Sequence, residues 1–170
     1  KIFSLQDRLS KGRNIKKNME LKKYFILIII FNFTNLLYAD IKPAENLTAY
    51  DVLKIQLKAL KNNNKPSKNA GIKQTWAFAH PENKKFTGPY ERFEKMLLGD
   101  QYKILLNHES HKIQLILSSK NKYIYNVELI SKGKKMYFYE WHLEKSTIDE
   151  CSDCWYTTIV SPPINKGNTI

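Results

Sequence analysis

Apolar residues recur at two spacings along the chain, and the change between them divides it into a helical part and a stranded part. The first spacing is helical and predicts a helix over residues 47–61 whose buried face carries Tyr50, Leu53, Leu57 and Leu60. Asn46 or Thr48 can cap its start. A run of asparagines and Pro66 ends the pattern.

A segment rich in aromatic residues, prolines and glycines follows, over residues 75–99. It predicts a short helical turn over residues 72–79, a loop bent at His80-Pro81, and a second helix that starts at Pro89 and stops at Gly99. We expect four aromatic side chains of this segment to close the open end of the fold: Trp76, Phe78, Phe86 and Phe93.

From residue 102 onward the apolar spacing becomes two, which is typical of half-buried strands. Strands are predicted over residues 102–106, 113–118, 122–130, 134–144 and 155–161, joined by short polar breaks that favour an antiparallel meander. One face of the third strand carries Tyr123, Tyr125, Val127 and Leu129, and one face of the fourth carries Tyr137, Tyr139, Trp141 and Leu143. The predicted fold class is α+β: an N-terminal helix and two short helices packed on a curved, cone-like antiparallel sheet of about five strands.

The N-terminal part predicts export. Residues 19–39 combine Lys22 and Lys23, an apolar run over 24–31 and a small residue, Ala39, which is the layout of a secretory signal peptide. The alternative is an uncleaved membrane anchor. We interpret residues 1–18 as an upstream extension, 40–164 as a single domain and 165–170 as a polar tail, with the mature protein in a periplasm, in a thylakoid lumen or secreted.

The formal net charge of +12 suggests an anionic partner at first. Residues 1–39 carry half of this excess, and residues 40–170 contain 20 Lys and Arg against 14 Asp and Glu. Arg92 is the only arginine after residue 39, whereas phosphate and base-edge recognition favours arginine, so nucleic acid is disfavoured. Docking to a charged surface through the lysines at 84–85 and 132–135 is a third hypothesis.

The cysteines and histidines give no strong motif. Cys151 and Cys154 form a lone CxxC, which offers too few ligands for structural zinc and lies outside a thioredoxin-like context, so a local disulfide or plain thiols are expected. His108 and His111 are assigned to a solvated hairpin loop rather than to a metal site. His80 is expected to hydrogen-bond to nearby backbone. No metal or cofactor is predicted.

The order of elements resembles the cone-shaped α+β fold of the nuclear-transport-factor-2-like superfamily. More specifically, residues 44–163 resemble the uncharacterised family called domain of unknown function 4864, above all its plastid and cyanobacterial versions. Three segments carry the resemblance. The first is the helix with Leu53, Gln56, Leu57, Ala59, Leu60 and Asn62, and the second is a central segment with Ala77, Phe78, His80, Pro81, Phe86, Phe93 and Met96. The third is the last strand, with Cys154, Trp155 and Val160. It implies a fold, and by analogy a homodimer through the sheet, but no reaction.

Two functions follow as hypotheses. The first is a non-catalytic domain that binds a small apolar ligand or a protein partner in the concave face of its sheet, with a pocket built from Trp76, Phe78, Phe93, Tyr125, Tyr139 and Trp141. The second is an isomerase or dehydratase, because enzymes with this cone fold use a pocket carboxylate with His or Tyr. Glu140 and His142 share one strand face and are the candidate catalytic pair.

Overall fold

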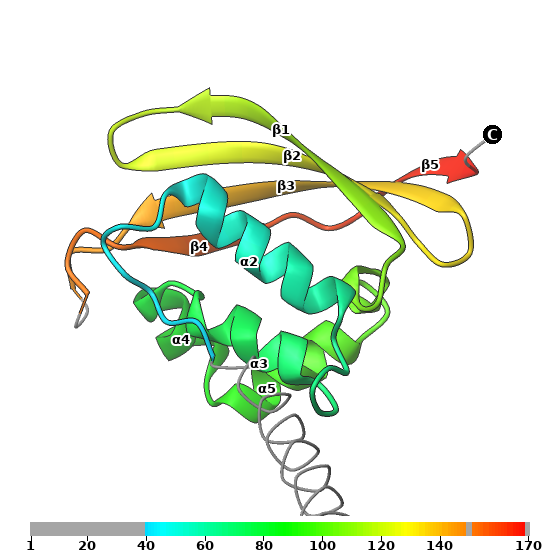
Figure 1. Ribbon diagram of the computed structural model, residues 1–170, viewed down its shortest axis with the longest axis horizontal. Coiled ribbons are helices and arrows are strands. Elements are labelled where there is room, and N and C mark those ends of the chain that lie inside the picture. Colours follow the sequence, from blue (N-terminus) through cyan, green and yellow to red (C-terminus); the bar gives the residue numbers. More distant parts are fainter. Residues whose placement is uncertain (1–39, 149–150, 169–170) are drawn as a thin grey trace, which may run out of the picture. The chain divides into compact units, whose positions relative to one another are not determined.

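The computed structural model describes residues 40–148 and 151–168, which form an α+β fold (Figure 1). The helices are α2 (Ala49–Lys61), α3 (Ala70–Ala77), α4 (Pro81–Thr87) and α5 (Tyr90–Leu98), followed by the 3-10 helix η1 (Lys103–Leu105). Five antiparallel strands follow: β1 (Ser110–Ser118), β2 (Lys122–Ile130), β3 (Lys135–Lys145), β4 (Trp155–Val160) and β5 (Ile164–Asn168). The predicted fold class is confirmed, while the predicted extension and leader, residues 1–39, lie outside the described residues.

The sheet is a meander in the order β1-β2-β3-β4, and β5 returns to pair with β3. β4 pairs with the second half of β3 and β5 with its first half. Ser161 lies between them: its amide donates to the Glu140 carbonyl, and its hydroxyl accepts from the Glu140 amide at 2.8 Å. Residues 165–168 of the predicted polar tail are exposed and belong to β5, so backbone pairing rather than apolar burial holds this strand.

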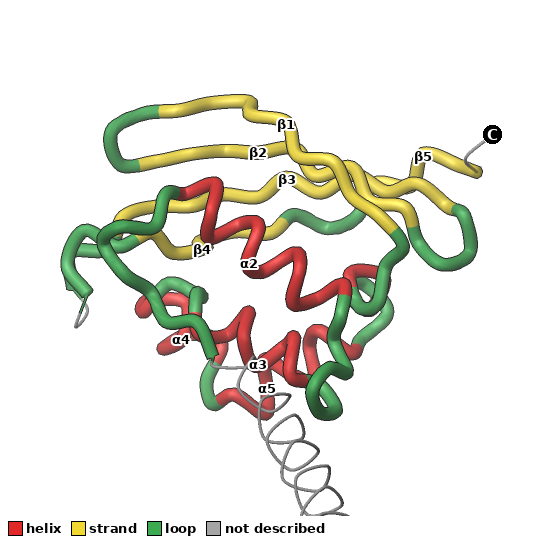
Figure 2. Tube along the Cα trace, in the orientation of Figure 1, coloured by secondary structure: helices red, strands yellow, loops and turns green. Residues whose placement is uncertain are grey.

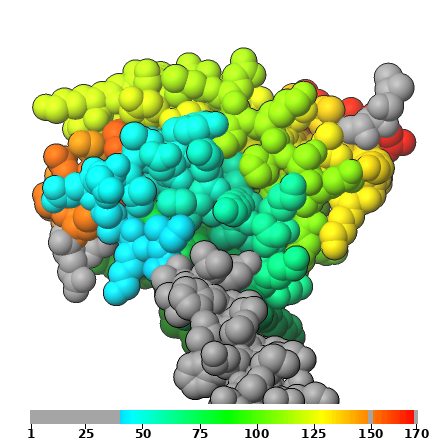
Figure 3. All heavy atoms as spheres, in the orientation of Figure 1, coloured from blue at the N-terminus to red at the C-terminus, as the bar shows by residue number. Residues whose placement is uncertain are grey.

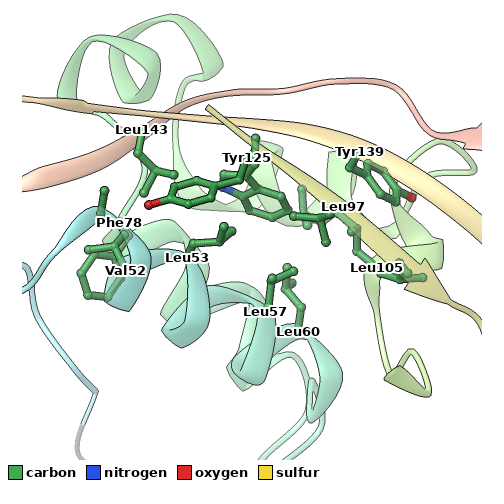
Figure 4. Packing of buried hydrophobic residues seen from close by; sticks show 14 of the residues in the cluster. Val52, Leu53, Leu57, Leu60, Phe78, Leu97, Leu105, Tyr125, Tyr139 and Leu143 are labelled. Atoms are coloured by element: carbon green, nitrogen blue, oxygen red, sulfur yellow. The ribbon is translucent and has the colours of Figure 1, made fainter. Parts of the chain in front are cut away.

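All the described helices lie on one side of the sheet, and no described helix covers the opposite face (Figure 2). The stripe of α2 formed by Leu53, Leu57 and Leu60 is fully buried against the sheet. Figure 4 shows these leucines pointing toward Tyr125 and Leu143. This stripe and the two strand faces predicted above form the core. Burying each of these leucines contributes about 1.5–3 kcal/mol to the stability of the fold.

Helices α2 and α3 approach very closely at Gly71. Its amide donates to the Asn63 carbonyl at 3.0 Å, and a Cβ placed on Gly71 would lie 2.2 Å from the Ala59 carbonyl oxygen. Only glycine fits such a contact between backbones. The close packing at Gly71 sets the distance between α2 and α3.

Two elements differ from their predictions. Residues 102–106 contain η1 (Lys103–Leu105) instead of a strand, because Tyr102 and Leu105 both pack against the core three positions apart. Residues 81–87, predicted as a loop, form α4, whose first residue is Pro81 and whose N-cap is His80. The helix buries none of its residues, so the sequence carried no apolar period there, and Phe86 is 84% exposed rather than part of a lid.

No helix within residues 40–148 and 151–168 is long and apolar enough to cross a bilayer.

Candidate functional site

A cavity of about 270 Å³ lies between the helices α3, α4 and α5 on one side and β4 on the other. Its walls come from α2, α3, α4, α5, η1, β3 and β4. Most of the lining is apolar and aromatic, including Trp76, Phe93, Met96, Leu97, Leu105 and Trp141. The polar members of the lining are Gln56, Thr75, Asn83, Thr87, Tyr102, Thr157 and Thr158.

Thr157 joins the two sides of this cavity through its backbone. Its amide donates to the Phe78 carbonyl at 2.8 Å, and its carbonyl accepts from the His80 amide at 2.9 Å. Residues 78–80 thereby pair with the edge of β4 that faces away from β3. This pairing satisfies backbone groups of an otherwise open strand and fixes the end of α3 against the sheet.

The side chain of Thr157 continues the link as part of a buried polar chain. The indole N–H of Trp141 donates to the Thr157 hydroxyl at 3.0 Å, which donates in turn to Gln56 Oε1 at 2.6 Å. Gln56 Nε2 then donates to the Thr75 carbonyl at 3.3 Å. Because indole nitrogen can only donate and a carbonyl can only accept, both ends of the chain fix the direction of every bond and the orientation of the Gln56 amide.

The chain leaves hydrogen-bonding capacity unused. The amide group of Gln56 has a second N–H, and its oxygen has a second lone pair. Gln56 lines the cavity and is 1% exposed, so it lies at the bottom of this space. Its second N–H and second lone pair are the hydrogen-bonding positions that remain there.

The rim of the cavity is apolar and accessible. Met96 and Ile159 line it and are 42% and 50% exposed. Asn83 holds α4 to the opposite wall, since its side-chain amide donates to the Thr158 carbonyl. A small molecule can reach the interior past these side chains.

The cavity lining contains no carboxylate, imidazole, thiol or ammonium group among the described residues. Its single ionisable side chain is Tyr102, whose hydroxyl donates to the Val160 carbonyl at 3.0 Å. Burial raises the pKa of Tyr102. The lining of this cavity is thus electrically neutral apart from any ionisation of Tyr102.

Three of the six predicted pocket aromatics line this cavity and three do not. Trp76, Phe93 and Trp141 line it, and the rings of Trp76 and Phe93 lie 4.9 Å apart. The other three pack in the core outside it: Phe78, Tyr125 and Tyr139, which are at most 4% exposed. Sequence periodicity places an aromatic side chain inside, but it does not distinguish a cavity wall from solid core.

Glu140 and His142 meet, as their spacing on β3 predicts, through a hydrogen bond between Glu140 Oε1 and His142 Nε2. They lie on the sheet face opposite the core, where the Glu140 side chain is 52% exposed. Glu140 borders a second, shallower hollow of about 400 Å³, together with Phe138 and residues 161–164. The pair is therefore on the far side of the sheet from the neutral cavity.

The structure joins Cys151 and Cys154 as a disulfide, with Cα atoms 5.6 Å apart. Cys154 is buried just before β4, and its carbonyl accepts from the Ser146 amide at 3.0 Å. This pair links two residues three positions apart at the end of the loop that leads from β3 into β4.

His108 lies between η1 and β1, and His111 is the second residue of β1. The interpretation of a solvated hairpin loop is wrong, because His108 is only 3% exposed. His108 Nδ1 donates to the Leu105 carbonyl at 2.7 Å. Its Nε2 therefore accepts from His111 Nδ1, also at 2.7 Å. Burial lowers the pKa of His108 to about 4, and Lys61 contributes in the same direction. Burial also lowers the pKa of His111.

Sequence reasoning missed the roles of Gln56 and Thr157. Gln56 did carry a signal, because its helical phase places it within the apolar stripe beside Leu53 and Leu60, where an amide needs a buried partner. Thr157 gave none, since a threonine is ordinary in a strand. Only the fold brings β4 next to α2.

No protein-family model, curated protein or solved structure matches this chain.

Replacing Thr157 with valine tests the polar chain. Thr157→Val keeps the shape but leaves the Trp141 indole N–H and Gln56 Oε1 without this partner, so we expect a loss of about 2–4 kcal/mol in the free energy of unfolding. Urea denaturation measures it. The matched control is Thr158→Val, whose hydroxyl is 3.5 Å from the His142 carbonyl, with an expected change within about 0.5 kcal/mol. Equal losses in both variants would refute the role of the chain.

The histidine pair predicts a pH dependence of stability. In the unfolded state His108 has a pKa near 6.5, whereas in the folded state its pKa is about 4. Between these two values the unfolded state binds more protons, so the free energy of unfolding falls as the pH falls from 6.5 to 4. The expected slope for this residue is about 1.4 kcal/mol per pH unit. The free energy of unfolding is measured between these pH values for the wild type and for His108→Gln/His111→Gln. The difference between the two slopes is the contribution of the histidines, because the carboxylates are the same in both proteins. An identical slope in both proteins contradicts the assignment.

Proposed function

We propose that this domain binds a small, mainly apolar, ring-shaped molecule in the cavity between α3–α5 and β4. The observation that carries the proposal is an apolar cavity of about 270 Å³ with unused hydrogen-bonding capacity at the buried Gln56. Large aromatic side chains surround the space without filling it. The polar chain through Thr157 holds the helices and the strand apart at this point.

The size of the cavity limits the ligand. Dedicated ligand pockets generally measure about 300–1,000 Å³, so this one is at the small end. An apolar cavity of about 150 Å³ is sufficient for benzene. A ligand of one or two fused rings therefore fits, whereas a nucleotide or a long lipid chain does not.

The chemistry of the walls limits it further. The rings of Trp76, Phe93 and Trp141 favour a flat apolar partner. Gln56 favours one polar group on that partner, because an amide can donate to it or accept from it. The neutral lining disfavours a charged ligand, since nothing there replaces the hydration of an ion.

Binding is favoured over the isomerase or dehydratase alternative. Such a reaction needs a general base beside the substrate. The candidate base, Glu140, borders the outer hollow and not the aromatic cavity. We also propose export through the leader over residues 19–39, as its sequence predicts.

A cavity-filling substitution tests this function. Ala79→Leu adds three carbons to a side chain that is 8% exposed and lines the cavity, while Ala77→Leu makes the same change two residues earlier, outside the lining. The probe is indole, which has two fused rings and one N–H. At about ten times its Kd we expect indole to stabilise the wild type by about 1.4 kcal/mol, or roughly 4 °C in Tm.

Ala77→Leu should keep this shift and Ala79→Leu should lose it. Melting curves without indole show that both variants are folded. A shift of equal size in Ala79→Leu, or none in the wild type, would rule out the cavity as the site.

A further inference from the structure

The excess positive charge of the folded part is concentrated in one segment. Residues 52–81 contain six lysines and no acidic residue. The remainder of residues 40–170 contains 14 Lys and Arg against 14 Asp and Glu. The net charge of +6 thus belongs entirely to residues 52–81, which cover most of α2, the turn after it and α3.

Five of these lysines form a continuous exposed surface, here called the lysine stripe. Lys54, Lys58 and Lys61 recur at positions i, i+4 and i+7 of the solvent face of α2, and Lys65 and Lys68 follow in the next turn. The opposite face of α2 is buried against the sheet. Figure 3 shows α2 on the visible face of the folded domain, next to residues 40–48.

Within the part of the chain that the structure describes, no ion pair joins a lysine of the stripe to a carboxylate, and Asp51 near Lys54 is the one acidic side chain with an electrostatic effect from the stripe. Several other lysines do form ion pairs: Lys85–Glu82, Lys103–Asp100, Lys112–Glu128, Lys122–Glu144 and Lys134–Glu109. The lysines at 84–85 and 132–135, named earlier as docking candidates, are thus partly neutralised. The lysine stripe is the stronger anion-binding surface.

The start of the domain is fixed beside this surface. Asp40 pairs with Lys73 of α3 at 3.1 Å. The Ile41 amide donates to Gln74 Oε1 at 2.8 Å, and Gln74 Nε2 donates back to the Ile41 carbonyl at 2.6 Å. Residues 40 and 41, where the described part of the chain begins, are therefore held at α3, which packs along α2.

We infer that the lysine stripe binds the headgroups of anionic phospholipids, with α2 lying along a membrane surface. Exposed lysines are attracted to anionic headgroups as point charges, at roughly fivefold in affinity per lysine. Nucleic acid fits less well, because Arg92, the only arginine of this region, is on α5 and outside the lysine stripe. Binding should weaken steeply with salt.

The test uses the full chain and flotation with phosphatidylcholine vesicles that contain either one-third phosphatidylglycerol or none. The measured quantity is the ratio of binding to the two vesicles, so that any apolar contribution of the leader cancels. The stripe variant is Lys54→Gln/Lys58→Gln/Lys61→Gln, and glutamine matches lysine in helix propensity. The control is Lys120→Gln/Lys132→Gln/Lys135→Gln, which removes three exposed charges elsewhere.

We expect the ratio to fall by roughly 100-fold in the stripe variant and to stay within about threefold in the control. The arginine version, Lys54→Arg/Lys58→Arg/Lys61→Arg, should restore it. Equal losses in both glutamine variants would show that only net charge matters and would overturn the inference. So would a wild type that ignores phosphatidylglycerol but binds duplex DNA through the same lysines.

Discussion

A single buried side chain, Thr157, connects the layers of this domain. Its backbone pairs with residues 78–80, and its hydroxyl joins Trp141 of β3 to Gln56 of α2. A polar group buried without a partner costs about 1–3 kcal/mol, so each bond of this chain depends on the others. The helices can neither slide along the sheet nor collapse onto it without breaking the chain. This constraint maintains an open cavity beside an otherwise solid core.

The same architecture separates two chemistries. Inside, aromatic walls and one amide line a neutral cavity. Outside, the solvent face of α2 carries Lys54, Lys58 and Lys61. Helix α2 thus contributes to both features, since its inner face supplies Gln56 to the cavity.

Much of the fold could be predicted from local pattern. The stripe of α2 and the inner faces of β2 and β3 follow their periods, because burial against one partner imposes a single phase. The predictions failed for elements whose formation does not depend on burying apolar side chains. α4 buries nothing, and β5 is held only by backbone bonds to β3, so neither leaves an apolar period. η1 follows a three-residue spacing that a short window cannot distinguish from a strand.

The site was less predictable than the fold. Trp76, Phe93 and Trp141 were named as pocket residues, but so were Phe78, Tyr125 and Tyr139, which pack in the core. Whether a wall has empty space behind it depends on contacts between residues far apart, such as Gln56 and Thr157, which are 101 positions apart. A crystal structure of the protein purified from its own source would test the central claim most directly. The account predicts electron density for a one- or two-ring molecule in contact with Gln56 and Trp76. An empty site closed by a rotated Trp76 or Phe93, with the helices packed directly onto β4, would contradict it.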